Sequence, residues 1–225
     1  MEYKSIAIDG PSGAGKSTLA RSLARELRFL YVDTGAIYRT VGLMALRSGV
    51  EPTDHDAVVA LLPRLDIRVV YGEDGLQHML LNGEDVTTDI RKNEVSHYAS
   101  CVSAIPEVRT FLLELQRKSA RENNVIMDGR DIGTVVLPNA DVKIFLTASP
   151  EDRARRRHLE LLERGEQVDY ETVLSDMVER DRNDESRAAA PLRKAEDAIV
   201  VDTTGNLLEE SLKILRETVK ERLQT

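Results

Sequence analysis

Residues 10–17, near the start of the chain, restrict its possible folds more than any other segment. They read Gly-Pro-Ser-Gly-Ala-Gly-Lys-Ser and fit the pattern G-x-x-x-x-G-K-[ST]. A short β-type run, residues 5–8, ends in Asp9 before them, and leucines recur every four residues after them, as on one face of a helix. Strand, glycine-rich turn and helix in this order predict a phosphate-binding loop. The alternative, a plain glycine-rich turn followed by a lysine, does not explain this context.

Each residue type in this loop has a physical role. Glycines let the backbone curl so that several N–H groups point at one anion, and the helix N-terminus adds a favourable dipole. Lys16 supplies a mobile positive charge for the β and γ phosphates, and the Ser17 hydroxyl is placed to bind Mg²⁺. The residues expected to bind the nucleotide are Gly10, Pro11, Ser12, Gly13, Ala14, Gly15, Lys16, Ser17 and Thr18.

The rest of the chain alternates strand and helix signals. Besides residues 5–8, short apolar strands are expected at 30–32, 125–127, 142–146 and 198–201. Helical patterns lie between them. Five such strands predict an α/β fold with a doubly wound, five-stranded parallel sheet and helices on both faces. The stretch 64–88 breaks the alternation, and its Asn82-Gly83 pair is a strong hairpin signal, which predicts a small antiparallel β-meander insertion.

Composition excludes several classes of function. The chain has 31 lysines and arginines against 39 acids, a net charge of −8, so it lacks the diffuse basic surface that non-specific nucleic-acid binding requires. Its apolar runs are far shorter than the roughly 18 residues of a membrane span. A single cysteine cannot close an intrachain disulfide, and no signal peptide is visible. We expect a cytoplasmic protein that binds neither nucleic acid nor membrane.

Two predicted strands end in an aspartate with an arginine two to six residues later. Asp33 and Arg39 follow the second strand, and Asp128 and Arg130 follow the third. Ligands bind at the carboxyl ends of parallel strands, where a carboxylate can hold Mg²⁺ through water and an arginine can hold a phosphate through two hydrogen bonds. The aspartates could instead cap turns, but the repetition beside a phosphate loop favours function. The expected metal-binding residues are Ser17, Asp33 and Asp128.

Two predicted helices carry further arginines. On the helix 170–187, Arg180, Asp184 and Arg187 are spaced four and then three apart, which places them on one face. They could also be ordinary surface ion pairs. The helix after Ser149 carries four arginines that could neutralise a transferring phosphate, or could pair with Glu151, Asp152 and Glu160 on the same helix. These four are Arg153, Arg155, Arg156 and Arg157, and we expect Arg155 to point away from the others.

Four segments together resemble the bacterial cytidylate kinase family over nearly the whole chain. They are residues 8–17 (IDGPSGAGKS), 33–39 (DTGAIYR), 128–134 (DGRDIGT) and 187–192 (RAAAPL). The resemblance implies a single P-loop kinase domain, 1–225, with a monophosphate-binding region at 34–105 and a helical lid at 150–190. It implies transfer of the γ-phosphoryl of ATP to CMP or dCMP, with Mg²⁺ as cofactor.

The resemblance also assigns roles to individual residues. The cytosine is held in the family by residues that match Ser100, Arg109 and Asp131, and the ribose lies near those matching Arg180 and Asp184. The residues matching the monophosphate site are Thr34, Arg39, Arg130 and Arg187, with Tyr38 lining the same pocket. Lid arginines match Arg153 and Arg157. The catalytic set implied is Lys16, Arg130, Arg153, Arg157 and Arg187.

The residue chemistry agrees with a preference for cytosine. A carboxylate at Asp131 can accept from the exocyclic amine, and Arg109 can donate to N3 and O2. The alternatives are a kinase for UMP, AMP or shikimate, or a nucleotide-binding switch without catalysis. A GTPase switch should carry Asn-Lys-x-Asp and a transporter-type ATPase Ser-Gly-Gly, and the sequence contains neither. We expect ATP, CMP and dCMP as the partners of a monomeric enzyme.

Overall fold

The computed structural model describes residues 3–73 and 75–223. Five strands form a parallel sheet in the order β2-β6-β1-β7-β8, which confirms the predicted fold class. The strands are apolar and short, and the β1–β7 register pairs Ile8 with Ile144. Their bounds are Ser5–Asp9 (β1), Leu30–Asp33 (β2), Val125–Gly129 (β6), Val142–Thr147 (β7) and Ile199–Asp202 (β8).

A second, antiparallel sheet contains β3 (Ile67–Tyr71), β4 (Gln77–Leu81) and β5 (Glu84–Asp85), which confirms the predicted meander. Asn82 and Gly83 make the tight turn between β4 and β5, and both have positive φ, 52° and 88°. Asn and Gly adopt this conformation at low cost, and for this reason the pair is a strong hairpin signal.

The chain divides into two compact units, with one boundary directly before β2 and another within β6. The first unit contains residues 30–125, and the second contains residues 4–29 and 126–223. No helix of the described chain is both long and apolar enough to cross a bilayer.

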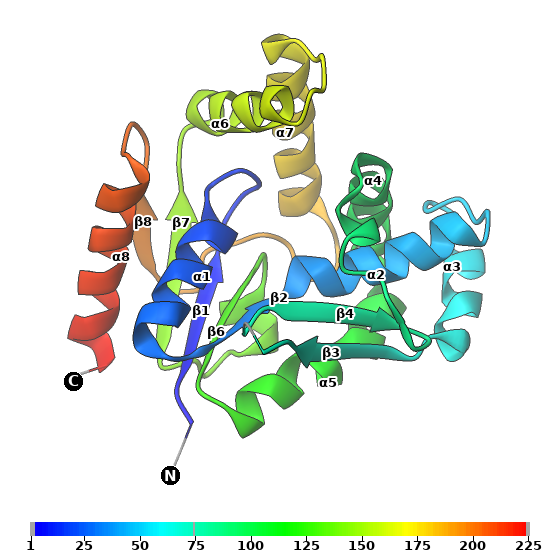
Figure 1. Ribbon diagram of the computed structural model, residues 1–225, viewed down its shortest axis with the longest axis horizontal. Coiled ribbons are helices and arrows are strands. Elements are labelled where there is room, and N and C mark those ends of the chain that lie inside the picture. Colours follow the sequence, from blue (N-terminus) through cyan, green and yellow to red (C-terminus); the bar gives the residue numbers. More distant parts are fainter. Residues whose placement is uncertain (1–2, 74, 224–225) are drawn as a thin grey trace. The chain divides into compact units, whose positions relative to one another are not determined.

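In the first unit, helix α2 (Thr34–Arg47) lies between α4 (Asn93–Val102) and the antiparallel sheet (Figure 1). The Asp33 carboxylate caps α2 by accepting from the Ala36 N–H at 2.9 Å. Gly42 allows α2 and α4 to pack closely, because a Cβ there would lie 2.9 Å from the Ala99 nitrogen. The other helical elements are α3 (His55–Leu61), η1 (Leu62–Arg64), η2 (Asp89–Arg91) and α5 (Pro106–Glu122).

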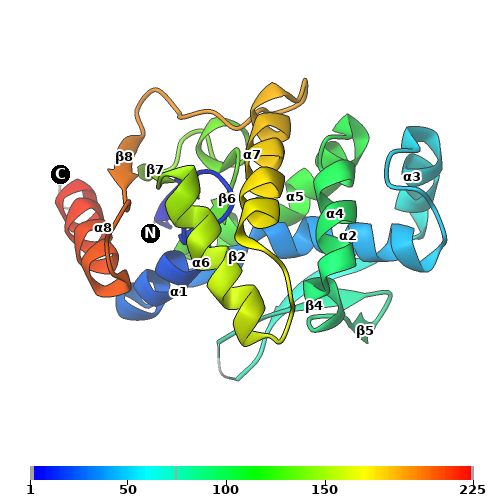
Figure 2. The ribbon, with the colours of Figure 1, turned by 90° about the horizontal axis from the view of Figure 1, so that it is seen from above.

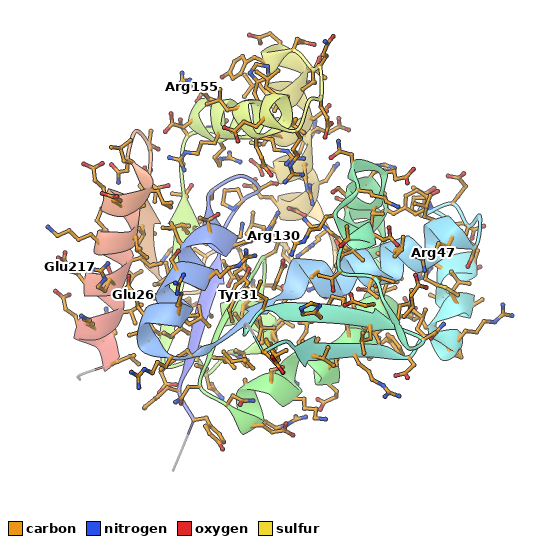
Figure 3. The ribbon with its side chains drawn as sticks, viewed as in Figure 1. Glu26, Tyr31, Arg47, Arg130, Arg155 and Glu217 are labelled. Carbon is orange, nitrogen blue, oxygen red and sulfur yellow. The ribbon has the colours of Figure 1, made fainter. Side chains whose placement is uncertain are left out.

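In the second unit, α1 (Lys16–Leu27) and α8 (Leu208–Leu223) pack side by side (Figures 1 and 2). Arg216 of α8 pairs with Glu26 of α1 at 2.7 Å, and Figure 3 shows Glu26 on the side of α1 that faces α8. Helices α6 (Pro150–Glu163) and α7 (Tyr170–Ser186) pack against each other and enclose a small apolar cluster around Ala154 and Met177. A five-residue π-helix, η3 (Ile132–Val136), follows β6.

One predicted boundary differs at a site residue. The helix expected to reach Arg187 ends at Ser186, and Arg187 has an extended backbone with φ −62° and ψ 141°. The Leu192 N–H donates to the Asp184 carbonyl at 2.8 Å, so the following chain folds back and ends the helix. The statement that Arg187 lies on the same helical face as Arg180 and Asp184 was therefore wrong, although Arg187 still lies near Asp184.

Candidate active site

The loop at residues 10–15 has the backbone of an anion site. Gly10, Gly13 and Gly15 have φ values of 151°, 72° and 85°, which side chains disfavour. At Gly10 a Cβ would lie 1.9 Å from the Leu146 carbonyl oxygen, so only glycine fits there. Among the described residues no side chain caps the N-terminus of α1. The first N–H groups of this helix are therefore available to a phosphate.

Lys16 is buried at the first position of α1, and its Nζ donates to the Pro11 carbonyl at 2.7 Å. Burial and the charge of Arg130 lower the pKa of Lys16 well below its ordinary value, against the opposing effect of Asp128 and Asp184. A triphosphate at the loop would supply further negative charge and favour the protonated ammonium. Lys16 is thus placed to respond electrostatically to an anionic ligand.

Ser17 and Asp128 form the part of the site that suits a divalent cation. The Ser17 hydroxyl donates to Asp128 Oδ2 at 2.8 Å, which brings a hydroxyl and a buried carboxylate together beside the loop. The described residues contain no cluster of three or more His, Cys, Asp or Glu side chains that could hold a metal. Mg²⁺ often takes one or two protein ligands and completes its shell with phosphate oxygens and water, so Ser17 and Asp128 fit it.

Asp33, the third residue predicted to bind the metal, lies in the first unit and has a structural contact. Its Oδ1 caps α2, and its backbone N–H donates to Gln77 Oε1 at 2.8 Å. The Gln77 amide donates in turn to the Asp33 carbonyl. The turn-capping role that we considered from the sequence is thus present at Asp33, and its metal role stays a prediction.

Arg130, Asp131, Asp184 and Arg187 form one charged cluster in the second unit. Arg130 Nε donates to Asp184 Oδ2 at 2.7 Å, and Figure 3 shows Arg130 below the end of α7. Arg187 lies 3.7 Å from Asp184 and 4.0 Å from Asp131. Burial would raise the pKa of Asp184, but the charges of Arg130 and Arg187, with that of Arg180, hold it below its ordinary value. The charges of Arg130 and Asp184 shift the pKa of Lys16, so the charged cluster and the phosphate loop interact electrostatically.

The arginines of α6 differ in their surroundings. Arg153 is 3 % exposed and donates to the Ser12 carbonyl at 2.9 Å and to Asp181 of α7 at 2.6 Å. It therefore connects the phosphate loop to both α6 and α7. Arg157 pairs with Glu160 at 2.9 Å on its own helix. Arg155 is exposed and points outward, as expected (Figure 3). Arg156 instead donates to the Thr203 carbonyl at 2.7 Å.

The remaining predicted substrate residues belong to the first unit. Thr34, Tyr38 and Arg39 lie on the first turns of α2, with Thr34 buried. The guanidinium of Arg109 on α5 stacks 5.4 Å from the centre of the Tyr38 ring and donates to the Ser103 carbonyl at 2.9 Å. The Ser103 hydroxyl donates to the carbonyl of Ser100 on α4 at 2.8 Å. These contacts connect Tyr38, Arg109 and Ser100, and their roles in substrate binding stay a prediction.

Sequence reasoning missed two acids that hold this site together. Asp181 fixes Arg153, and Asp9 accepts the N–H groups of Ile132 and Gly133. A signal for Asp9 existed, because an acid at the end of a buried strand and directly before the glycine loop calls for a partner. Asp181 could not have been found, since its partner lies 28 positions away on another helix.

Comparison with known proteins identifies the family of this chain. The family model for cytidylate kinase matches residues 6–221. The chain belongs to the cytidylate kinase family. A curated cytidylate kinase from Carboxydothermus hydrogenoformans is 54% identical over 214 residues, covering 95% of this chain and 96% of the relative. Another from Caldicellulosiruptor bescii is 52% identical over 217 residues and covers 96% of each chain.

A solved structure shows the same fold at low identity. An uncharacterized protein from Eubacterium ventriosum matches with a TM-score of 0.53 and 13% identity, over 96% of this chain and 98% of that chain. At this identity the likeness concerns the fold alone. Membership of the cytidylate kinase family, by contrast, covers both units of the chain, since the family model begins in β1 and ends in α8.

Proposed function

We propose that this protein transfers the γ-phosphoryl group of ATP to CMP and dCMP, producing ADP and the nucleoside diphosphate. The proposal rests mainly on one observation: the phosphate loop and the charged cluster lie close together within the second unit. Lys16 and Arg130 interact electrostatically, and Asp184 binds both Arg130 and Arg187. The relatives of this chain at 54% and 52% identity are named cytidylate kinases, which also supports the proposal.

The reaction needs positioning and positive charge rather than a protein base. An oxygen of the CMP phosphate is already an anionic nucleophile and attacks the γ-phosphorus in line, while the bond to the β–γ bridging oxygen breaks. Two anionic substrates repel each other, so cationic groups must offset their charge. Lys16 would neutralise charge on the transferring group, and Arg130 and Arg187 would hold the acceptor phosphate.

Mg²⁺ would bind at Ser17 and Asp128, where it would neutralise phosphate oxygens of ATP. Arg153 keeps the phosphate loop attached to α6 and α7 through Ser12 and Asp181. Closure of the lid helices would exclude water and limit ATP hydrolysis. Arg157, whose side chain is 30 % exposed and pairs with Glu160 one turn away, is the lid arginine better placed to change partner.

Asp131 and Arg109 support recognition of cytosine. Asp131 is 4 % exposed, and a buried carboxylate accepts a hydrogen bond from the amine of cytosine, whereas uracil offers a carbonyl oxygen there. Arg109 already stacks on Tyr38, so its guanidinium has a defined plane from which to donate to N3 and O2. A wrong base would leave buried polar groups without partners, which discriminates strongly.

A steady-state assay with ATP and a panel of acceptors tests the function. ADP formation should be fastest with CMP or dCMP, and much slower with UMP, AMP or shikimate. A preference for UMP or AMP by a wide margin would overturn the base assignment. ATP binding without any acceptor-dependent ADP formation would instead indicate a nucleotide-binding switch.

A further inference from the structure

Asp9 is a buried carboxylate between two functional segments of the second unit. It ends β1, and its neighbour Gly10 begins the phosphate loop. Its side chain accepts two hydrogen bonds, Oδ1 from the Ile132 N–H and Oδ2 from the Gly133 N–H, both at 2.7 Å. Because the two oxygens of one carboxylate bind two successive amides, both the position and the orientation of this backbone are fixed.

The fixed amides belong to the segment that follows β6. The Ile132 N–H is part of the peptide bond formed by the Asp131 carbonyl, so Asp9 holds the backbone next to Asp131. Arg130 is one residue earlier and reaches Asp184. Ile132 also begins η3, a π-helical turn of a kind that occurs often at functional sites. One side chain therefore connects the start of the phosphate loop to the segment that carries two residues assigned to the acceptor.

Keeping a carboxylate at this position costs stability. Burial raises the pKa of Asp9 to about 6, against the lowering effect of the Gly133 and Ile132 amides. The charged groups that face it are Asp131, which adds to the rise, and Lys16, which opposes it. Lys143 of β7 passes beside Gly133, but its ammonium pairs with Asp197 at 2.8 Å. A buried acid with a raised pKa beside a site is a candidate for function rather than for stability.

We propose that Asp9 is a positioning residue for the acceptor nucleotide, holding the backbone of Arg130 and Asp131 in register with the phosphate loop. It touches neither substrate and acts through these two residues. The inference rests on the proposed function, since it assumes that Asp131 binds the base and Arg130 the monophosphate. It makes Asp9 a determinant of acceptor binding and of cytosine selectivity, although Asp9 directly precedes the segment that binds ATP.

Gly133 gives a second way to disturb the same contact. A Cβ at Gly133 would lie 3.3 Å from Asp9 Oδ2 and 3.1 Å from Lys143 Cδ. Gly133→Ala therefore crowds the Asp9 carboxylate without removing it. Asp141 provides a matched control, because it accepts the Ser5 N–H at 2.8 Å and pairs with Lys4 at 2.7 Å, next to the first residue of β1 and away from the loop.

The test compares wild type, Asp9→Asn, Gly133→Ala and Asp141→Asn by steady-state kinetics. In Asp9→Asn the amide can accept only one of the two N–H groups. We expect KM for CMP to rise roughly tenfold to a hundredfold and the preference for CMP over UMP to narrow, with KM for ATP changed by less than about threefold. Gly133→Ala should change the same parameters in the same direction, but less. In the double variant, KM for CMP should rise by less than the product of the two separate fold-changes.

Asp141→Asn should leave both KM values and the base preference unchanged. An equal rise in KM for ATP and CMP in Asp9→Asn would show that Asp9 serves the phosphate loop, and would overturn the proposal. So would unchanged kinetics with CMP. If Asp9→Asn does not fold, Gly133→Ala decides alone by the same criteria.

Amide hydrogen exchange separates this inference from the proposed function. Exchange of the Ile132 and Gly133 amides should be at least about tenfold faster in Asp9→Asn or Gly133→Ala than in wild type, because their acceptor is lost or displaced. Wild-type protein that does not phosphorylate CMP would refute the function whatever the exchange rates. Active wild type with unchanged exchange in both variants would refute the positioning role of Asp9.

Discussion

At the scale of single residues, the site contains a lysine, Lys16, at a position where burial disfavours the charged form. Lys16 is buried, and burial with the nearby Arg130 lowers its pKa, so the protein gains little stability from this ammonium. Such a group is worth keeping only if a ligand compensates it. Removing the charge should therefore damage catalysis far more than folding.

Lys16→Ala should reduce kcat by about a hundredfold or more while the protein remains folded, because the transferring phosphoryl group loses its nearest cation. Steady-state kinetics and a circular dichroism melt measure the two effects. Lys220→Ala, at an exposed position near the end of α8, is the matched control and should keep wild-type kinetics. Wild-type turnover in Lys16→Ala would refute the role of Lys16.

Asp9 leads to a prediction about pH and stability. Its pKa rises from 3.8 in the unfolded chain to about 6 in the folded protein, so the folded state binds more protons between these values. The free energy of unfolding should therefore fall as pH rises from about 4 to about 6, by up to roughly 1.4 kcal/mol per pH unit from this group. Urea unfolding of wild type and Asp9→Asn across this range measures the contribution as the difference between the two slopes. Parallel slopes would contradict it.

At the scale of helices and strands, the packing of α2 against α4 positions two residues of the first unit that we assign to the acceptor, Tyr38 and Ser100. Gly42 sits where the two helices approach, next to Ala99, and Ser100 is the following residue. Tyr38 is one turn before Gly42 on α2. The distance between these helices therefore controls how Tyr38 and Ser100 face a common ligand.

Gly42→Ala should separate the helices, since its Cβ would lie 2.9 Å from a backbone nitrogen that cannot move by itself. We expect a loss of about 1–3 kcal/mol in the free energy of unfolding and a higher KM for CMP, with KM for ATP little changed. Denaturant unfolding and kinetics provide the two measurements. Ser48→Ala, at the exposed end of α2, should change stability by less than about 0.5 kcal/mol. A stable Gly42→Ala with normal kinetics would show that the helices adjust.

Strands and helices could be predicted from the sequence where a local pattern of residues is enough to determine the secondary structure. The five strands and the meander followed from apolar runs and from Asn82-Gly83, and the structure has all of them. The turn η3 could not be found, because Ile132-Gly133-Thr134-Val135-Val136 reads as a strand by itself. Its shape depends on Asp9, more than 120 positions away. Likewise, the helical period placed Arg153 on a face but could not show that Asp181 and Ser12 bury it.

At the scale of the whole molecule, the chain is acidic, with 39 acids against 31 lysines and arginines and a net charge of −8. We expect the phosphate loop, Arg130 and Arg187 to bind compact anions, although the chain as a whole is acidic. A long polyanion must approach the acidic surface as well as the site. We therefore expect the net negative charge to disfavour binding of nucleic acid more than binding of a single nucleotide.

The protein should bind ATP but should not retard duplex DNA or single-stranded RNA in a gel-shift assay at physiological salt, because an extended polyanion meets net repulsion. ATP added to the same sample is the positive control, detected by a shift in melting temperature.

Light scattering after size-exclusion chromatography should give the mass of a monomer, 25.2 kDa. Retardation of nucleic acid at that salt, or a dimer mass, would contradict the respective prediction.

The first turn of α1, which no side chain of the described protein caps, has a practical consequence for work at the bench. Any small oxyanion in the buffer, such as sulfate or inorganic phosphate, will bind to these amides and raise the melting temperature. Because these ions compete with ATP, affinities for ATP measured in such buffers will be underestimated. In a crystal grown from sulfate, we expect a sulfate ion at the position of a nucleotide phosphate. Solutions whose only added anion is chloride are the better choice for titrations.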